Sequence, residues 1–307
     1  MRIALIGQQE FGKAVFNAFL KRGDEVAGVF CAPETPGSRP DPLAAAAQEA
    51  GIGLFRFASY STNEAQNALR GLNADIGIMA YVLIFAPQAF VKIPKFGTIQ
   101  FHPSLLPAHR GPSSINWPII MGRTKTGLSI FRPTDGLDEG PLILQREVGI
   151  GPDDTLGTVY FDKLFPLGVE ALLEAADLVV SGRAMETPQN EAHASYEGWV
   201  LDRESHIDWA KPAGQIYNLI RGCNPQPGAW TTVRGERLAI FDCRKRIVRT
   251  FGEVRGRKLG EVVECGSSSF TVLAAGGFIE VLRCKRGEGK KVAANEAGIE
   301  AGTMLGT

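Results

Sequence analysis

The 307-residue sequence predicts an α/β fold, in which a Rossmann-like, mainly parallel sheet with helices on both faces is followed by a small OB-like β-barrel. Two patterns carry this prediction. Short β-rich runs alternate with helical stretches as far as Ile150, and short β-rich runs with glycine-bearing turns fill the C-terminal third. With 44% hydrophobic and 21% charged residues, the chain is typical of a globular protein of two domains.

The first domain is expected to span residues 1–188. We expect strands at Arg2–Gly7, Glu25–Cys31, Asp75–Val82, Thr98–His102, Leu128–Arg132 and Leu142–Val148. We expect helices at Phe11–Arg22, Pro42–Ala50, Asn63–Gly71 and Ser113–Met121, and one more from an N-cap at Asp153-Asp154-Thr155 to about Ser181. Ligands of such a sheet bind beyond the carboxyl ends of its strands.

The periodicity is lost after Gly182, and residues 189–202 are expected to form a linker. The second domain is then expected to span residues 203–307, with a helix at Ala213–Arg221. Its strands are expected near Ala229–Val233, Arg237–Asp242, Gly260–Val263, Ser269–Ala274 and Phe278–Cys284. Five short strands separated by glycine-bearing turns favour a barrel of the OB type.

Charge and cysteine usage exclude several classes. Lys plus Arg and Asp plus Glu both number 33, so the net charge favours neither nucleic acid nor membrane. The chain starts with a short strand rather than a secretory signal, and the longest apolar run, Ile76 to Ala86, is too short for a membrane span, so we expect a cytoplasmic protein. The five cysteines form no CxxC pair and are expected to be reduced packing residues, with no metal site.

The first turn, Gly7-Gln-Gln-Glu-Phe-Gly12-Lys13-Ala14, satisfies neither of the two glycine-loop motifs that it approaches. A Walker loop needs Ser or Thr at Ala14, and the dinucleotide fingerprint needs a third glycine. The second predicted strand also ends at Cys31-Ala32-Pro33, without the acidic residue that would bind a ribose. A nicotinamide-dependent oxidoreductase is therefore disfavoured, and a turn that needs small residues is the preferred interpretation.

The segment Gln100-Phe-His102-Pro-Ser-Leu-Leu-Pro107 is more specific, because a strand that ends in histidine and runs into prolines puts an imidazole at the carboxyl edge of the sheet. A lone histidine there is more often packed or solvated than catalytic. Asp135-Gly136-Leu137-Asp138-Glu139-Gly140 supplies an acidic, glycine-flanked loop between two later strands. Loops at one sheet edge can meet, and a carboxylate beside an imidazole fixes its tautomer.

These segments resemble the folate-dependent formyltransferase family along nearly the whole chain. Further matching segments are His109-Arg110-Gly111, Ile115-Asn116-Trp117, Leu142-Ile143-Leu144-Gln145 and Ile207-Asp208-Trp209. Methionyl-tRNA formyltransferase and the hydrolase domain of 10-formyltetrahydrofolate dehydrogenase share both domains. The closest local resemblance is to that hydrolase domain, in Ile6-Gly-Gln8, Leu164-Phe-Pro166, Tyr196-Glu-Gly198 and Ile220-Arg-Gly222.

The resemblance implies a 10-formyltetrahydrofolate donor bound to the first domain. It implies catalytic roles for His102 and Asp138, with Gln100 in the position of a third catalytic residue. The family has asparagine there, so this chain departs from the pattern. The pterin ring is expected against the backbone of three residues and beside the acidic loop; the implied contacts are Leu83, Ile84, Phe85, Asp135, Gly136, Leu137 and Gly140.

The chemistry agrees with these roles. Attack on a formyl carbon makes a tetrahedral oxyanion, which needs preorganised donors such as the His102 imidazolium and the Gln100 amide. Asp138 is suited to relay a proton from the nucleophile to the departing folate nitrogen. Glutamine carries the same amide as asparagine on one more methylene, and a displacement near 1 Å can cost about a hundredfold in rate.

The formyl acceptor stays open between water, a small amine such as an amino sugar, and initiator methionyl-tRNA. The stretch Ala32–Asp41, where a transferase acting on tRNA is expected to carry a basic insertion, holds one basic residue, Arg39. Against that stands a basic cluster in the second domain, as expected of a phosphate-binding surface but equally of a solvated face: Arg234, Arg237, Arg244, Lys245, Arg246, Arg249, Arg255, Arg257, Lys258, Arg283, Lys285, Arg286, Lys290 and Lys291. A hypothesis of another class is a non-catalytic folate-binding module.

Overall fold

The computed structural model describes residues 1–248 and 254–306 and divides them into two compact units. Unit 1 comprises Met1–Gly111, Gly127–Val148 and Lys163–Tyr196. Unit 2 comprises Pro112–Thr126, Gly149–Asp162 and the described residues from Glu197 onward. The domain boundaries expected from the sequence, 188 and 203, remain a proposal.

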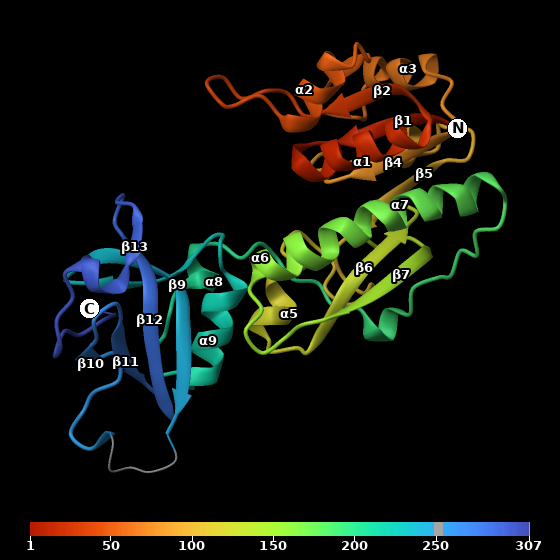
Figure 1. The fold of residues 1–307 in the computed structure, drawn as a ribbon. Helices are drawn as coiled ribbons and strands as arrows, with labels where there is room; N and C mark the ends of the chain where they lie inside the picture. Colours follow the sequence, from red (N-terminus) through yellow and green to blue (C-terminus); the bar gives the residue numbers. More distant parts are fainter. Residues whose placement is uncertain (249–253, 307) are drawn as a thin grey trace. The chain divides into compact units, whose positions relative to one another are not determined.

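The larger sheet has seven strands in the order β3-β2-β1-β4-β5-β6-β7 (Figure 1). Its strands are β1 (Arg2–Gly7), β2 (Glu25–Cys31), β3 (Leu54–Arg56), β4 (Ile76–Ala80), β5 (Thr98–His102), β6 (Lys125–Phe131) and β7 (Leu142–Gly149). Strands β3, β2, β1, β4 and β5 pair in parallel, whereas β6 pairs antiparallel with β5. The predicted mainly parallel sheet is therefore confirmed, with β3 as a short edge strand that the sequence pattern missed.

The helices that accompany this sheet are α1 (Gln9–Arg22), α2 (Pro42–Glu49), α3 (Asn63–Gly71), α4 (Gln88–Val91) and α7 (Phe165–Val180). On one face, Phe11 of α1 packs against Phe101 of β5 and Phe165 of α7, with ring centroids 4.4 and 5.3 Å away. On the other face, Leu69 of α3 and Phe90 of α4 belong to the core that covers β1, β2 and β4. Helices thus cover both faces, as predicted.

Local chemistry explains where the first helices begin. Asp41 accepts hydrogen bonds from the main-chain N–H groups of Leu43 and Ala44 at 3.0 and 3.1 Å, and Pro42 occupies the first turn of α2. Thr62 caps α3 in the same way through Ala65. The helix expected from Thr155 to Ser181 differs in form. A short α6 (Leu156–Thr158) and a π-helical segment (Val159–Leu164) precede α7, whose first turn contains Pro166 and so lacks one N–H donor.

Unit 2 contains α5 (Asn116–Ile120), α8 (Asp202–Ser205), α9 (Ala213–Gly222) and an antiparallel sheet. The strands are β8 (Ala229–Val233), β9 (Glu236–Ile247), β10 (Val262–Cys265), β11 (Phe270–Ala274), β12 (Gly277–Arg286) and β13 (Lys291–Ala293). Their order is β10-β11-β12-β9-β8, with β13 on β12. Leu305 bridges Val233 beside β8, and Met304 bridges Glu261 beside β10, so the C-terminal segment joins the two sheet edges.

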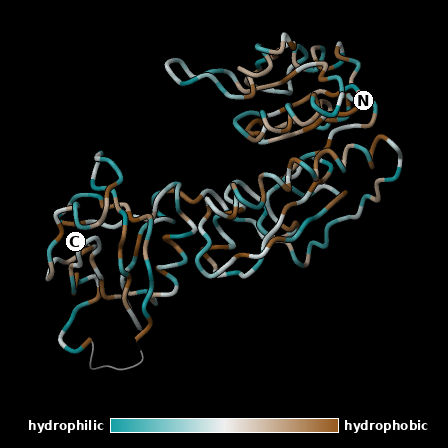
Figure 2. Tube along the Cα trace, in the orientation of Figure 1, coloured by the Kyte–Doolittle hydropathy of each residue, from teal (hydrophilic) through white to brown (hydrophobic). Residues whose placement is uncertain are grey.

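The hydrophobic residues follow this architecture. Ile3, Ala4, Leu5 and Ile6 of β1 are fully buried, as expected for a central strand covered on both faces. The hydropathy colours of Figure 2 show hydrophobic segments in the interior strands and a hydrophilic loop after β2. Among the described residues, no helix has the length and hydropathy needed to cross a membrane.

Candidate active site

His102 ends β5 at the carboxyl edge of the larger sheet, where its side chain is only 7% exposed. Its Nε2 lies 2.9 Å from the carbonyl oxygen of His109. A carbonyl can only accept, so Nε2 carries the hydrogen of this bond. The other ring nitrogen, Nδ1, faces Asp138 Oδ2 at 3.6 Å, which is an ion-pair distance rather than a formed hydrogen bond.

Asp138 approaches from the acidic loop between β6 and β7 and is 8% exposed. Its Oδ2 accepts a hydrogen bond from the main-chain N–H of Gly111 at 2.9 Å. No described group bonds Oδ1, which leaves this oxygen available to a reacting molecule. The structure therefore brings together the two residues that the sequence singled out, with His102 Nδ1 beside the carboxylate of Asp138.

Gln100 lies two residues before His102 on β5, so the two side chains share one face of the strand. It pairs with Met79 of β4 and Phe131 of β6, which puts it in the interior of the sheet rather than at an edge. Within the described residues its amide has no hydrogen-bond partner. An amide at this position can donate to an oxyanion that forms in front of His102.

The loop after β4 forms the neighbouring surface. Residues 83–85 lie outside regular secondary structure, and none of their main-chain groups bonds to another described residue. Leu83 and Phe85 are each 59% exposed, whereas Ile84 packs against the core that lies under the loop. Free amide and carbonyl groups beside exposed apolar side chains suit a planar heteroaromatic ligand.

The acidic loop is tied to this surface. The main-chain N–H of Gln88 donates to Asp135 Oδ1 at 3.0 Å, and the Gln88 side chain donates to the Pro133 carbonyl at 2.9 Å. Leu137 is 58% exposed, so its side chain is available for an apolar contact. A Cβ on Gly140 would lie 1.6 Å from the Arg132 carbonyl oxygen, so the turn needs glycine there. The hydrogen bonds of Gln88 thus tie the acidic loop to the segment that follows residues 83–85.

Sequence reasoning missed the buried cation next to this site. Arg110 follows His109 and has a fully buried side chain, which donates hydrogen bonds to Gln189, Glu191 and Tyr196. These hydrogen bonds lower the pKa of the Glu191 carboxyl. The pKa of Tyr196 is raised, chiefly because its hydroxyl donates to Glu139. The only sequence signal was the match at His109-Arg110-Gly111, which gave Arg110 no role.

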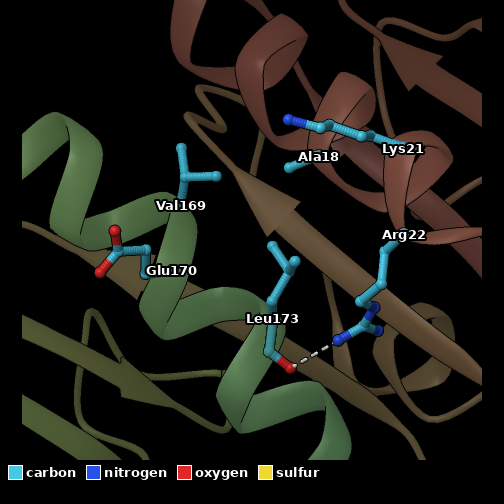
Figure 3. Close-up of a pocket in the computed structure, with 6 residues that line it drawn as sticks. All are labelled: Ala18, Lys21, Arg22, Val169, Glu170 and Leu173. Atoms are coloured by element: carbon cyan, nitrogen blue, oxygen red, sulfur yellow. Dashed lines mark hydrogen bonds between the residues drawn. The ribbon is translucent and has the colours of Figure 1, made fainter.

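A separate pocket of about 370 Å³ lies between α1 and α7 (Figure 3). It is lined by Ala18, Lys21, Arg22, Val169, Glu170 and Leu173. Arg22 turns to the Leu173 carbonyl at 3.4 Å and to Asp177 at 3.0 Å, so its cation joins the two helices. The pocket residues of α1 belong to its last turns, near the amino ends of the strands, whereas His102 lies at the carboxyl end of β5. This pocket is thus distant from the site.

Metal chemistry has no candidate ligand set in the described part of the chain, where no three His, Cys, Asp or Glu side chains gather around one point. The cysteines are free thiols. Burial raises the pKa of Cys31 and of Cys223 to about 12, so both stay protonated near neutral pH. Neither is suited to act as a nucleophile.

Comparisons with known proteins agree with this geometry. The model of the family described as formyl transferase matches residues 1–175, and that of the formyl transferase C-terminal domain matches residues 201–298. The chain belongs to the formyl transferase family. It is therefore an enzyme of folate-dependent one-carbon transfer, with the family's N- and C-terminal domains.

The similar proteins differ in how much of their length is matched. Mitochondrial 10-formyltetrahydrofolate dehydrogenase of Mus musculus is 40% identical over 246 residues, which are 78% of this chain and 26% of that protein. The chain thus spans about a quarter of this relative. Methionyl-tRNA formyltransferase of Dinoroseobacter shibae is 34% identical over 310 residues, covering 99% of this chain and 98% of that protein.

A solved structure shares the fold. HypX from Aquifex aeolicus, in complex with tetrahydrofolic acid, superposes with a TM-score of 0.67 at 19% identity. The similarity covers 96% of this chain and 46% of HypX. At this identity the comparison supports the fold alone.

Proposed function

We propose that this enzyme transfers the formyl group of 10-formyltetrahydrofolate to the amino group of methionyl-tRNA. The observation that carries the formyl chemistry is the pair formed by His102 Nδ1 and Asp138 at 3.6 Å, beside the unpaired main chain of residues 83–85. The acceptor is supported by similarity to methionyl-tRNA formyltransferase over 99% of the chain and 98% of that relative.

The proposed mechanism assigns each atom one task. The acceptor amine attacks the formyl carbon, and the oxyanion that forms accepts hydrogen bonds from His102 Nδ1–H and the Gln100 amide. Losing one such donor typically costs about 2.7–4 kcal/mol of transition-state stabilisation. Asp138 Oδ1 takes the proton from the attacking nitrogen and delivers it to N10 of the folate, directly or through one water. The carbon–nitrogen bond to N10 then breaks, and tetrahydrofolate leaves.

The proposed folate site uses the surface after β4. The pterin ring lies against residues 83–85 and pairs with their free N–H and C=O groups. The acidic loop closes the other side through Asp135, Gly136, Leu137 and Gly140. The hydrogen bond from Gln88 to Asp135 holds the acidic loop beside the segment after β4 before any ligand binds.

The basic face of unit 2 is the proposed contact surface for the tRNA backbone. Some of its arginines already pair with carboxylates: Arg244 with Glu280, Arg283 with Asp242, Arg286 with Glu236, Arg257 with Glu261 and Arg237 with Asp202. Exposed ion pairs of this kind are weak, typically 0–1 kcal/mol, so phosphates can compete for these arginines. Arg249 lies outside the described residues.

A second candidate is hydrolysis, in which water replaces the amine. Three observations favour it. Gln100 stands where the transferases have asparagine, and the loop after β2 has one basic residue, Arg39. The matching region of mitochondrial 10-formyltetrahydrofolate dehydrogenase is 40% identical to this chain.

One set of assays separates the candidates. The enzyme is incubated with 10-formyltetrahydrofolate alone, with initiator methionyl-tRNA, and with small amines, while tetrahydrofolate, formate and formylated amine are measured. We expect formylmethionyl-tRNA, with much slower formate release when no tRNA is present. Formate release at one rate in every mixture would establish the hydrolase instead. Folate binding without tetrahydrofolate production would establish a non-catalytic binding module.

Variants of Gln100 refine the distinction between transfer and hydrolysis. A transferase must hold its amine within about 3–3.5 Å of the formyl carbon, so the donor at residue 100 has to be well placed. Water is small and tolerates an imperfect donor. We therefore expect Gln100→Ala to reduce amine formylation much more than formate release, measured on the same preparation. Equal losses of amine formylation and formate release would show that Gln100 does not distinguish transfer from hydrolysis.

A further inference from the structure

The segment 187–196, which follows α7 in unit 1, contacts both loops of the candidate site. It begins with Thr187, which exchanges two main-chain hydrogen bonds with Leu142 at the start of β7, at 2.8 and 2.9 Å. Most of it lies outside regular secondary structure, apart from a short turn at Glu191–His193. Its order therefore comes from long-range contacts rather than from its own sequence pattern.

The centre of these contacts is Arg110, whose side chain is completely buried. Its Nε and Nη2 donate to Gln189 Oε1 at 3.1 and 2.8 Å. Its Nη1 and Nη2 donate to the two oxygens of Glu191 at 2.9 and 2.7 Å, and Nη1 also donates to the Tyr196 hydroxyl. A buried guanidinium needs such partners, so the segment and Arg110 hold each other in one arrangement.

The same segment holds the acidic loop. Because Gln189 Oε1 accepts from Arg110, its Nε2 is the donor, and it bonds to the carbonyl oxygens of Asp138 and Gly140 at 2.8 and 2.7 Å. The Tyr196 hydroxyl donates to Glu139 at 2.6 Å. Asp138, Glu139 and Gly140 are therefore each tied to the segment, and through it to Arg110.

The segment also holds the loop that orients His102. Ser195 Oγ accepts from the main-chain N–H of His109 at 2.8 Å, and the Ser195 carbonyl accepts from Arg110 N–H at 2.9 Å. The carbonyl of His109 is the acceptor that binds His102 Nε2. Both members of the candidate catalytic pair thus depend on the same ten-residue segment, one through Gln189 and the other through Ser195.

We propose that Gln189 is a positioning residue, which uses Arg110 as its anchor to hold the main chain of Asp138 at the distance from His102 that formyl transfer requires. This inference rests on the proposed function, because it assumes that the pair carries the chemistry. Gln189 touches neither ring nitrogen of His102 nor the carboxylate of Asp138. It acts on the backbone of the acidic loop.

Gln189→Glu is the most informative variant. A carboxylate of the same size still accepts from Arg110, but it cannot donate to the carbonyl oxygens of Asp138 and Gly140, and it repels them. Misplacement near 1 Å can cost about a hundredfold in rate, so we expect kcat to fall between about tenfold and a hundredfold. We expect KM for 10-formyltetrahydrofolate to change much less than kcat, because Asp135 keeps its bond to Gln88 although Gly140 loses its bond to Gln189.

Glu191→Gln is the matched control. Glu191 contacts the same guanidinium and has a side chain 66% exposed, but no hydrogen bond joins it to the acidic loop. We expect this variant to keep kcat near the wild-type value even where it unfolds at a lower temperature. If both variants lost the same fraction of kcat, the effect would come from Arg110 alone and the role of Gln189 would be refuted.

A structural measurement makes the inference independent of turnover. In crystals of the Gln189→Glu enzyme we expect Asp138 Oδ2 to have left the Gly111 N–H, from which it lies 2.9 Å in the wild type. An unmoved Asp138 would overturn the proposal, whatever the kinetics. Wild-type enzyme that released no formyl group would refute the proposed function instead, while this comparison would still decide whether Gln189 positions Asp138.

Tyr196→Phe covers the case in which Gln189→Glu does not fold. Its ring is half exposed and keeps its packing, and only the hydrogen bonds with Glu139 and Arg110 are lost. We expect a smaller fall in kcat with unchanged KM. Wild-type kcat in Tyr196→Phe, with a well-folded protein, would contradict the positioning role of the segment.

Discussion

Two residues at the site have an unusual backbone conformation. Asp138 has φ +56° and His109 has φ +59°, both in the left-handed region that non-glycine residues rarely adopt. Such conformations cost of order 1–3 kcal/mol each and persist only when the surroundings determine them. Here the surroundings are the hydrogen bonds that Asp138 accepts from the Gly111 N–H and from Gln189 Nε2, and the bond that the His109 N–H donates to Ser195 Oγ. The position of the carboxylate is thus set by its backbone as much as by its side chain.

Substitution of Asp138 by asparagine or by alanine separates the role of its carboxylate in proton transfer from its role in holding the backbone. Asn tolerates the left-handed region and keeps an oxygen for the Gly111 N–H, but it cannot accept a proton. We expect Asp138→Asn to lose about 10²–10⁴ in turnover with a nearly unchanged melting temperature. Asp138→Ala should lose the same activity and about 1–3 kcal/mol of stability. Turnover assays and thermal unfolding of both variants check this; a destabilised Asn variant would show that the charge also holds the loop.

Among the elements, the connections after β4 and after β5 leave the carboxyl edge of the parallel strands. Because β6 runs antiparallel to β5, the loop between β6 and β7 starts near the beginning of β5 and reaches His102 through Asp138. The sequences of these connections provide functional side chains and also glycines where the backbone leaves no room for a side chain. Gly140 lies just before β7 and next to Arg132, which follows β6. No Cβ fits at this position because the Arg132 carbonyl occupies the space. The glycines of the acidic loop are therefore part of the geometry of Asp138.

Gly140→Ala tests this requirement. A methyl group 1.6 Å from a carbonyl oxygen forces the loop to move, and overpacking of this kind costs about 1–3 kcal/mol. We expect weaker folate binding and loss of turnover, measured by titration and by kinetics. Gly149→Ala on β7 is the matched control, since an added Cβ there meets nothing within 4 Å. Equal behaviour of the two variants would mean that the turn adapts without cost.

The strands and longer helices were predictable because each carries its own periodic pattern. β1, β2, β5 and α3 have the predicted bounds, since alternation, N-caps and glycine stops are local signals. β3 and α4 were missed because three or four residues show no period. The approach of Asp138 to His102 agrees with the expectation from the strand end and the glycine-flanked acidic loop, and the catalytic roles of the two residues stay a proposal.

The contacts that organise the site were less predictable. The partners of Arg110 lie 79 to 86 residues away along the chain, in a segment that reads as polar and aperiodic. A local pattern cannot report such pairings, because the contacts of residues 187–196 are with the acidic loop and Arg110, which are distant in the sequence. The free main chain of residues 83–85 likewise appears only with tertiary structure, although the following Ala86-Pro87 suggested it.

On the scale of the whole molecule, the two units carry different surfaces. The candidate chemistry lies in unit 1, and the described residues of the basic cluster lie on β9, β12, β13 and the neighbouring turns in unit 2. On β9, Arg244 is 72% exposed in its side chain, and Arg246 stacks over the Phe278 ring with its guanidinium 4.3 Å from the centroid. The net charge of the chain is zero, so any attraction for a polyanion depends on this local face.

Charge reversal tests whether this face binds tRNA. We expect Arg244→Glu with Arg246→Glu to weaken formylation of methionyl-tRNA and to make it less sensitive to salt, because each lost phosphate contact lowers the slope of log affinity against log salt by about 0.9. Folate-dependent formate release should be unchanged. The control is Arg203→Glu with Lys211→Glu, two exposed positions outside β9 and β12. If both double variants bound tRNA with the same affinity, the tRNA would bind to another surface.

The most direct test of the account is a crystal structure with 5-formyltetrahydrofolate, a stable formyl folate. We expect the pterin ring to pair with the main chain of residues 83–85 and to lie beside Asp135–Gly140. We expect the reactive edge of the folate to lie within hydrogen-bonding reach of His102 Nδ1 and Asp138 Oδ1. A pterin bound elsewhere, for example in the pocket between α1 and α7, would contradict the proposed site and the mechanism built on it.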